Sequence, residues 1–198
     1  NQFKHGFMDL PYQFDLVHQE IEYTKELLRG KNTIVIIGIG GSDLGARAIN
    51  QVFRGNLKNE NGDLKVYFAG DTTDPDIYNE LDSHLDYDKT LFVVISKSGN
   101  TVEQSVAFIY FRNKVIEKLS KEQELNHFLF ITDPVDGFLR ELSMKYGYKS
   151  INLPQNVGGR FSVLSSVGMV FAGIIGCDVE KILNGAKDLD AEFKRDDI

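Results

Sequence analysis

Two short runs of the chain, Thr33–Ile37 and Leu91–Ile95, are almost entirely apolar and rich in β-branched residues. A strand with one face in water alternates between apolar and polar side chains, whereas a strand covered on both faces does not. Both runs therefore predict strands buried on two sides. Because amphipathic segments separate the strand-like runs, the chain is expected to build βαβ units around a parallel sheet.

The same alternation extends over the whole chain. Strands are expected at about 33–37, 64–69, 91–95, 127–131 and 148–153, and helices at about 14–28, 43–54, 77–81, 101–119, 137–145, 162–175 and 178–194. The pattern predicts an α/β fold, a three-layer α-β-α sandwich with a five-stranded parallel sheet of flavodoxin-like or Rossmann-like architecture. Residues 1–198 are interpreted as one domain, with a helical lead-in at about 1–30 and two C-terminal helices at about 162–194.

Composition excludes several classes of protein. Twenty-two Lys and Arg stand against 29 Asp and Glu, a formal charge of −7, which argues against a nucleic-acid partner. No apolar stretch approaches the roughly 20 residues that span a bilayer, so no membrane segment is expected. A single cysteine, Cys177, and the absence of an N-glycosylation sequence indicate a reducing, cytoplasmic setting. The four histidines lack metal-ligand spacing, and no metal is predicted.

A glycine-rich loop, Gly38–Gly45, follows the first apolar strand and precedes a helix. Glycines let a backbone approach an anion closely, and the N-terminus of a helix presents unpaired N–H groups to it. Ser42 adds a hydroxyl, although a tight turn with a helix cap would explain the pattern equally well. A dinucleotide site is the alternative, with Asp71 near the ribose, but Asp43 stands where that fingerprint needs a third glycine.

A second loop, Ser96–Thr101, follows the third strand and carries three hydroxyls around a glycine, with Lys97 as a nearby point charge. Thr101 and Gln104 match a capping box, which predicts a helix start at this point. The hydroxyls would then serve only as caps. In a parallel sheet, however, this loop and the glycine loop leave at the same edge. Together they favour a phosphorylated small molecule as the ligand.

A third segment, Gln155–Ser162, comes after the expected fifth strand and contains two consecutive glycines followed by Arg160. An arginine held at this sheet edge could stabilise negative charge, although a solvated arginine is the commoner case. Ser162 is expected to cap the helix that follows.

These motifs, in this order, resemble the glucose-6-phosphate isomerase family. The resemblance rests on Gly38–Arg47, Ile95–Glu103, Val157–Ser162 and the segment Phe7–Pro11, and it covers essentially the whole chain. It implies the N-terminal sugar-isomerase (SIS) domain of an enzyme that interconverts glucose 6-phosphate and fructose 6-phosphate. The resemblance further implies an enediolate intermediate, no cofactor, and a homodimer of the full-length protein.

The resemblance also implies a role for each matching position. The sugar phosphate would be held by Gly41, Ser42, Ser96, Lys97, Ser98 and Thr101. The backbone of Gly159 would contact substrate, and Arg160 would stabilise the enediolate.

Two departures from the family pattern qualify this expectation. Asn100 stands where many relatives have threonine. The family's catalytic base, a glutamate in a Gln-X-X-X-Glu context, has no counterpart, and Glu103 is expected in a helical turn instead. Because the chain starts at Asn1 and lacks this base, it is interpreted as a fragment that binds sugar phosphate without appreciable turnover. A non-enzymatic SIS module that senses sugar phosphates and a nicotinamide-dependent oxidoreductase remain the alternatives.

Overall fold

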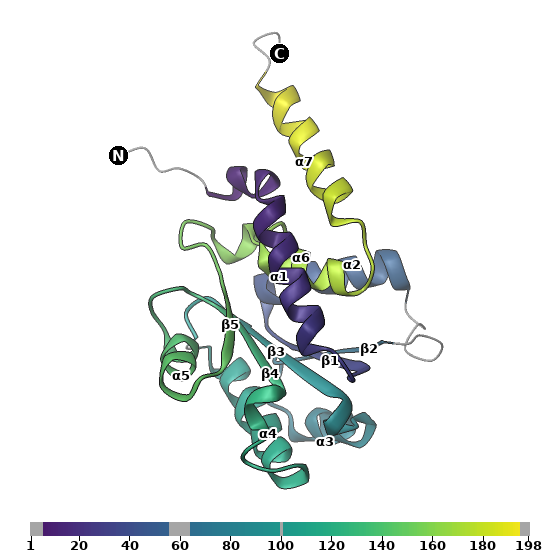
Figure 1. Ribbon diagram of the computed structural model, residues 1–198, viewed down its shortest axis with the longest axis vertical. Coiled ribbons are helices and arrows are strands. Elements are labelled where there is room, and N and C mark those ends of the chain that lie inside the picture. The colour runs from purple at the N-terminus through teal and green to yellow at the C-terminus, as the bar shows by residue number, and fades with distance from the viewer. Residues whose placement is uncertain (1–5, 56–63, 100, 195–198) are drawn as a thin grey trace.

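The computed structural model describes residues 6–55, 64–99 and 101–194. Five parallel strands form one sheet in the order β2-β1-β3-β4-β5. Their bounds are β1 Thr33–Ile37, β2 Lys65–Ala69, β3 Thr90–Ser96, β4 Phe128–Thr132 and β5 Lys149–Asn152. The predicted fold class is confirmed. Because all five strands run the same way, the loops after β1, β3 and β4 leave the sheet at one edge (Figure 1).

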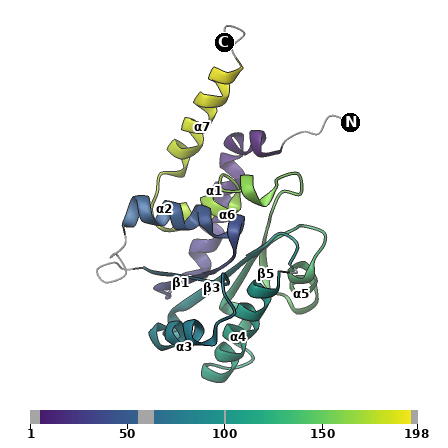
Figure 2. The same ribbon diagram turned by 180° about the vertical axis from the view of Figure 1, so that it is seen from behind.

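Helices cover both faces of this sheet (Figures 1 and 2). They are α1 Phe14–Leu27, α2 Leu44–Arg54, α3 Pro75–His84, α4 Val102–Lys118, α5 Phe138–Tyr146, α6 Ser166–Ile174 and α7 Val179–Phe193. Short 3₁₀ turns are η1 Gly6–Tyr12, η2 Gly40–Ser42, η3 Tyr87–Lys89, η4 Glu124–Asn126 and η5 Gly159–Phe161. Helices α3, α4 and α5 lie on one face and α2 and α6 on the other. Helix α1 packs on α6, and α7 extends away from the body of the molecule (Figure 1).

The core differs in character on the two sides of the sheet. Beneath α3, α4 and α5 it is aromatic, with Phe92 stacked on both Phe111 and Phe128 at 5.2 Å between ring centroids. Beneath α2 and α6 it is mainly aliphatic, as with Ile34 and Val170. Every residue of β1, β3 and β4 is buried, which is why these strands read as unbroken apolar runs in the sequence.

Several predicted helix boundaries were wrong by a few residues. The helix expected at 77–81 runs from Pro75 to His84, with Asp74 as its N-cap. The helix expected from 162 starts at Ser166, and its cap is Ser165, whose hydroxyl accepts a hydrogen bond from the Val167 N–H. Ser162 is not the cap because its hydroxyl is used elsewhere, on the turn η5 and on the glycine loop.

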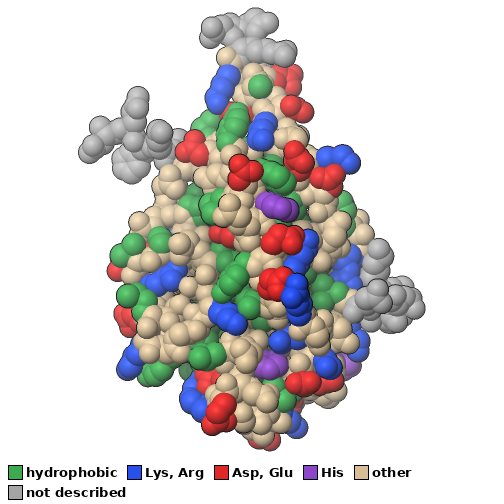
Figure 3. All heavy atoms as spheres, in the orientation of Figure 1, with side chains coloured by type: hydrophobic (Ala, Val, Ile, Leu, Met, Phe, Trp, Pro, Cys, Tyr) green, Lys and Arg blue, Asp and Glu red, His purple; other side chains and the backbone are tan. Residues whose placement is uncertain are grey.

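The surface mixes charges of both signs (Figure 3). Acidic and basic side chains are interspersed on the face shown, without a continuous basic stripe. None of the helices in the described ranges is long and apolar enough to cross a membrane. Among the same residues, no three His, Cys, Asp or Glu side chains gather in a way that could hold a metal ion.

Candidate functional site

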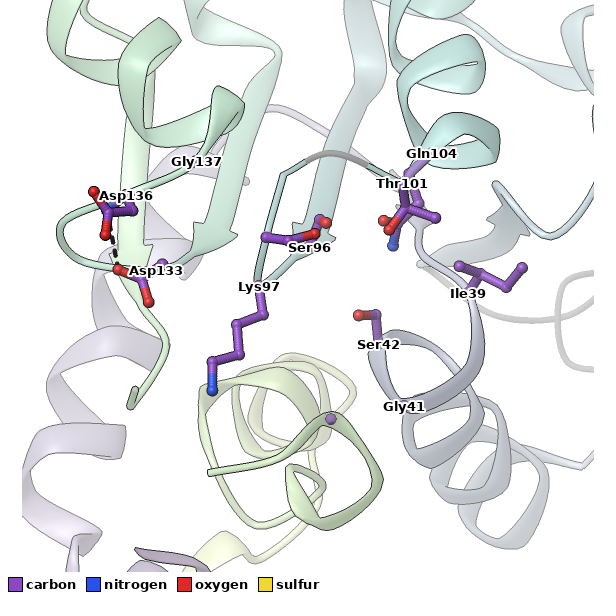
Figure 4. Close-up of a pocket in the computed structure, with 12 residues that line it drawn as sticks. Ile39, Gly41, Ser42, Ser96, Lys97, Thr101, Gln104, Asp133, Asp136 and Gly137 are labelled. Atoms are coloured by element: carbon purple, nitrogen blue, oxygen red, sulfur yellow. Dashed lines mark hydrogen bonds between the residues drawn. The ribbon is translucent and has the colours of Figure 1, made fainter. Parts of the chain in front are cut away.

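A cavity of about 540 Å³ opens at the carboxyl ends of β1, β3 and β4 (Figure 4). This edge of a parallel sheet is where α/β proteins bind their ligands. The lining residues come from four loops and the first turn of α4: Ile39, Gly41, Ser42, Ser96, Lys97, Ser98, Thr101, Gln104, Asp133, Asp136, Gly137 and Gly159. All six residues predicted to hold phosphate, and Gly159, therefore meet at one cavity.

The glycine loop after β1 touches the turn η5 backbone to backbone. A Cβ atom added to Gly41 would lie 2.1 Å from the Gly159 carbonyl oxygen, so only glycine leaves room for this approach. The Ser162 hydroxyl lies 2.8 Å from the Gly159 carbonyl oxygen and 3.2 Å from that of Gly41, and it donates to this pair. Ser42 thereby faces the cavity from a loop held in place by η5 (Figure 4).

A hydrogen bond between a side chain and the backbone of the same loop stabilises the hydroxyl loop after β3. Ser96 is only 4% exposed, and its side-chain oxygen accepts a hydrogen bond from the Gly99 N–H at 3.0 Å. Gly99 has φ +68°, a conformation that side chains disfavour. Thr101 is the N-cap residue of α4, so the unpaired N–H groups of that helix start beside the cavity. Asn100 lies outside the described residues.

The Lys97 ammonium group bridges two loops. It was predicted to stand beside the hydroxyls as a point charge, and the side chain does line the cavity. Its Nζ atom, however, donates to the carbonyl oxygens of Gln155 and Val157 at 2.6 and 2.9 Å. Figure 4 shows the side chain extended away from Ser96 toward that segment. Lys97 thus fixes the glycine segment before η5 while adding positive charge to the cavity wall.

The predicted capping box at the start of α4 is wrong in its contacts, although the helix does begin at Val102. The Thr101 side chain makes no cap hydrogen bond. Gln104 turns inward instead, and its Nε2 group donates to the carbonyl oxygen of Ile95 on β3. Gln104 is 3% exposed and lines the cavity, so it belongs to the site. The end of β3 offers an acceptor that the sequence pattern does not reveal.

Sequence reasoning missed the loop after β4, which supplies Asp133, Asp136 and Gly137. Their place after a predicted strand at the same sheet edge was the available signal. A Cβ atom on Gly137, whose φ is +100°, would lie 2.4 Å from the Ser98 carbonyl oxygen, so the two loops touch. Although desolvation alone would raise the pKa of Asp133, the N–H groups of Val135 and Asp136 hold it below its ordinary value.

Arg160 is the one predicted site residue outside the cavity lining. Its side chain is exposed, with the guanidinium carbon 5.7 Å from the centre of the Phe161 ring. Phe161 in turn stacks on Phe7 of η1 at 4.9 Å. Phe7, at the start of the segment Phe7–Pro11, therefore lies against the arginine-bearing turn.

Asp71, the acid of the dinucleotide alternative, and Asp43, which occupies the position of that fingerprint's third glycine, both pair with Arg47. Asp43, 2% exposed, pairs with Arg47 Nε at 2.5 Å, and Arg47 Nη2 lies 2.9 Å from Asp71. The same guanidinium lies over the Phe68 ring at 4.7 Å. Burial raises the pKa of Asp43 in spite of its arginine partner. Arg47 thus links Asp71 to Asp43 in the glycine loop.

The family model for phosphoglucose isomerase matches residues 22–198. The chain belongs to the phosphoglucose isomerase family. A glucose-6-phosphate isomerase of Mycoplasmopsis pulmonis is 34% identical over 198 residues, which are 98% of this chain and 46% of the relative. The chain thus spans about half the length of this curated relative.

Two solved structures share the fold. A hypothetical protein from Thermus thermophilus is 32% identical with a TM-score of 0.87, over 96% of this chain and 44% of that one. A glucose-6-phosphate isomerase from Chlamydia trachomatis is 28% identical with a TM-score of 0.74, over 89% and 33% respectively. The architecture is of the SIS type found in the phosphoglucose isomerase family and other sugar isomerases.

Proposed function

We propose that this chain forms the sugar-phosphate-binding part of an enzyme that interconverts glucose 6-phosphate and fructose 6-phosphate. The observation that carries the proposal is the meeting of Ser42 with the hydroxyl loop at one cavity (Figure 4). The hydroxyls of Ser42, Ser96, Ser98 and Thr101 can donate to phosphate oxygens, and the first N–H groups of α4 favour the same negative charge. The backbone at Gly41 completes the proposed phosphate-binding end of the cavity.

The sugar carbons would extend from the phosphate toward η5. Isomerisation moves a proton between C2 and C1 of the ring-opened sugar through an enediolate, and this step requires a base and a stabilised oxyanion. Arg160, beside Gly159 at the edge of the cavity, is proposed to stabilise the enediolate. The exposed guanidinium lies over the Phe161 ring, and we propose that it turns from there toward the substrate, since it makes no hydrogen bond or ion pair with the described residues.

Asp133, a carboxylate that lines the cavity, is a poor candidate for the base. Asp133 Oδ1 accepts hydrogen bonds from Val135 N, Asp136 N and Gln155 Nε2 at 2.8–3.1 Å, and its pKa lies below the ordinary value. A weakly basic carboxylate whose Oδ1 already accepts three hydrogen bonds is unsuited to proton abstraction from carbon. Because the sequence also has no counterpart of the family's Gln-X-X-X-Glu pattern, we propose that the base is not supplied by the residues of this chain. The enzyme would act in the cytoplasm, as a homodimer when full length, without a cofactor.

The phosphate assignment is tested by calorimetric titration with 6-phosphogluconate, an unreactive sugar phosphate. The wild type should bind, and the double variant Ser96→Ala/Thr101→Ala should bind at least tenfold more weakly, since it loses two hydrogen bonds to a charged group. Ser105→Ala is the matched control, because its hydroxyl contacts the Thr101 carbonyl and lies outside the cavity. Equal binding by the double variant would refute the assignment.

Activity assays test the second part of the proposal. The 198-residue chain should show no glucose-6-phosphate isomerase turnover above background. Measurable turnover would contradict the proposal that the base is not among the residues of this chain. Sugar-phosphate binding combined with no catalysis by any longer form of the protein would instead favour the sensing module.

A further inference from the structure

The buried amide of Gln104 has one hydrogen-bonding atom without a partner. Its Nε2 group donates to the Ile95 carbonyl, whereas Oε1 is buried and has no hydrogen-bond partner among the described residues. The residue is 3% exposed and reaches the cavity wall beside Thr101 (Figure 4). Buried polar atoms in native proteins are nearly always paired, so this acceptor calls for a donor that arrives with the ligand.

The kind of donor follows from the place of Gln104 in the site. It lies among the hydroxyls proposed to hold phosphate, so the phosphate group is the part of the ligand closest to Oε1. A fully ionised phosphate monoester carries only acceptor oxygens and would repel a carbonyl oxygen. A singly protonated monoester has one P–OH group, which can donate.

The charges around the cavity point the same way. Asp133 and Asp136 line it from the β4 loop, and Glu103 precedes Gln104 on α4. Among the described residues that line the cavity, Lys97 is the one Lys or Arg, and its ammonium donates to two backbone carbonyls. The first N–H groups of α4 favour one negative charge on the ligand. Two carboxylates against one engaged ammonium disfavour a second.

We propose that Gln104 selects the singly protonated form of the sugar phosphate by accepting a hydrogen bond from its P–OH group at Oε1. The inference rests on the proposed function and adds the ionisation state of the ligand. The second pKa of a phosphate monoester is about 6. Binding should therefore strengthen as the pH falls through that value, while Asp133, with its lowered pKa, stays ionised.

The test compares two unreactive ligands between about pH 8 and about pH 5.5, on either side of the second phosphate pKa. Glucitol 6-phosphate gains a proton in this range, whereas glucitol 6-sulfate stays a monoanion without an acidic hydrogen. Calorimetry should show the wild type binding the phosphate at least tenfold more tightly at the lower pH. Its affinity for the sulfate should not change. In Gln104→Met, which has no carbonyl acceptor, the phosphate should lose this dependence on pH. The sulfate, which also carries only acceptor oxygens, should bind to this variant no more weakly than to the wild type.

A second variant is needed because Gln104→Met also loses the hydrogen bond to the Ile95 carbonyl, and this loss could disturb the site. Gln104→Glu retains an acceptor, so its preference for the phosphate at lower pH should persist or steepen. If Gln104→Met no longer binds the sulfate, the pH profile of Gln104→Glu tests the inference in its place. Wild-type affinity that is flat or rises toward the higher pH would overturn the inference and leave the proposed function standing. An unchanged pH profile in Gln104→Met would overturn it as well. Failure of the wild type to bind at any pH would overturn both.

Discussion

Glycine at position 41 is required by space alone. Its φ is not in the left-handed region, yet an added Cβ would meet the Gly159 carbonyl oxygen at 2.1 Å. Two loops that are far apart in the chain come together at this point, and one of them carries Ser42. The side chain that would separate them is a single methyl group.

The substitution Gly41→Ala is therefore expected to push η5 away from the glycine loop. We expect a loss of about 1–3 kcal/mol in the free energy of unfolding, typical of overpacking, and weaker binding of 6-phosphogluconate. Urea denaturation and calorimetry measure the two effects. Gly158→Ala is the control, because its new Cβ would only make ordinary contact with Phe161 at 3.5 Å. Equal stability of the two variants would contradict the close approach.

At the scale of elements, a charged cluster away from the lining of the cavity joins α4, η4 and Tyr148, the residue before β5. Glu124 is 3% exposed and pairs with Arg112 at 2.6 Å and with Lys121 at 3.2 Å. The hydroxyl of Tyr148 donates to the same carboxylate. None of these side chains lines the phosphate cavity. The cluster therefore separates effects on stability from effects on binding.

Glu124→Ala should lower the free energy of unfolding by about 3–5 kcal/mol, since it leaves a partly buried arginine without its partner. Binding of 6-phosphogluconate by the folded variant should stay at the wild-type level. Chemical denaturation and calorimetry provide the two readings, with the exposed Glu122→Ala as control. A large loss of affinity for 6-phosphogluconate in a fully folded Glu124→Ala variant would instead show that α4 couples this cluster to the site.

A second contact between elements, α1 on α6, includes a carboxyl group whose ionisation is expected to affect stability. Glu20 accepts a hydrogen bond from Ser166 at 2.6 Å, but burial, the larger effect, raises the pKa of its carboxyl group. A carboxyl group with a raised folded-state pKa favours folding at low pH. That contribution is lost as the pH rises through the folded-state pKa.

Glu20→Gln should therefore be more thermostable than the wild type near neutral pH, and the difference in Tm should vanish below about pH 4, where both side chains are neutral. The amide keeps an oxygen for Ser166. Glu22→Gln on the same helix is the control, because Lys25 lowers the pKa of that exposed carboxyl group and no stabilisation is expected. A pH-independent difference in Tm would argue against the ionisation of Glu20 as the cause.

For the molecule as a whole, four loops and one helix start converge on the cavity, so a ligand there links elements that are distant in the chain. A ligand that binds only the folded state stabilises it by about 2.7 kcal/mol at a hundred times its Kd. For a chain of this size, 6-phosphogluconate at that concentration should raise the Tm by about 5–10 °C. Differential scanning fluorimetry measures the shift, and Ser96→Ala/Thr101→Ala at the same concentration should show little of it.

Much of the site could be predicted from the sequence because it lies in loops that directly follow recognisable strands. The runs at 33–37 and 91–95 located β1 and β3, and with them Ser42 and the hydroxyl loop. The loop after β4 was not predicted as part of the site because Asp133 and Asp136 belong to no short motif. Gln104 was misread because a capping box and an inward-turned glutamine share the same sequence.

What the sequence determined by itself is the parallel sheet and the edge at which its loops emerge, because the completely buried strands β1, β3 and β4 are apolar along nearly their whole length. The tertiary structure alone decided which polar atoms meet there. Lys97 pairs with carbonyls 58 and 60 residues away, and Ser162 with Gly41 at a separation of 121. Hydrogen bonds of this kind depend on how distant loops fall against one another, and no local periodicity records that.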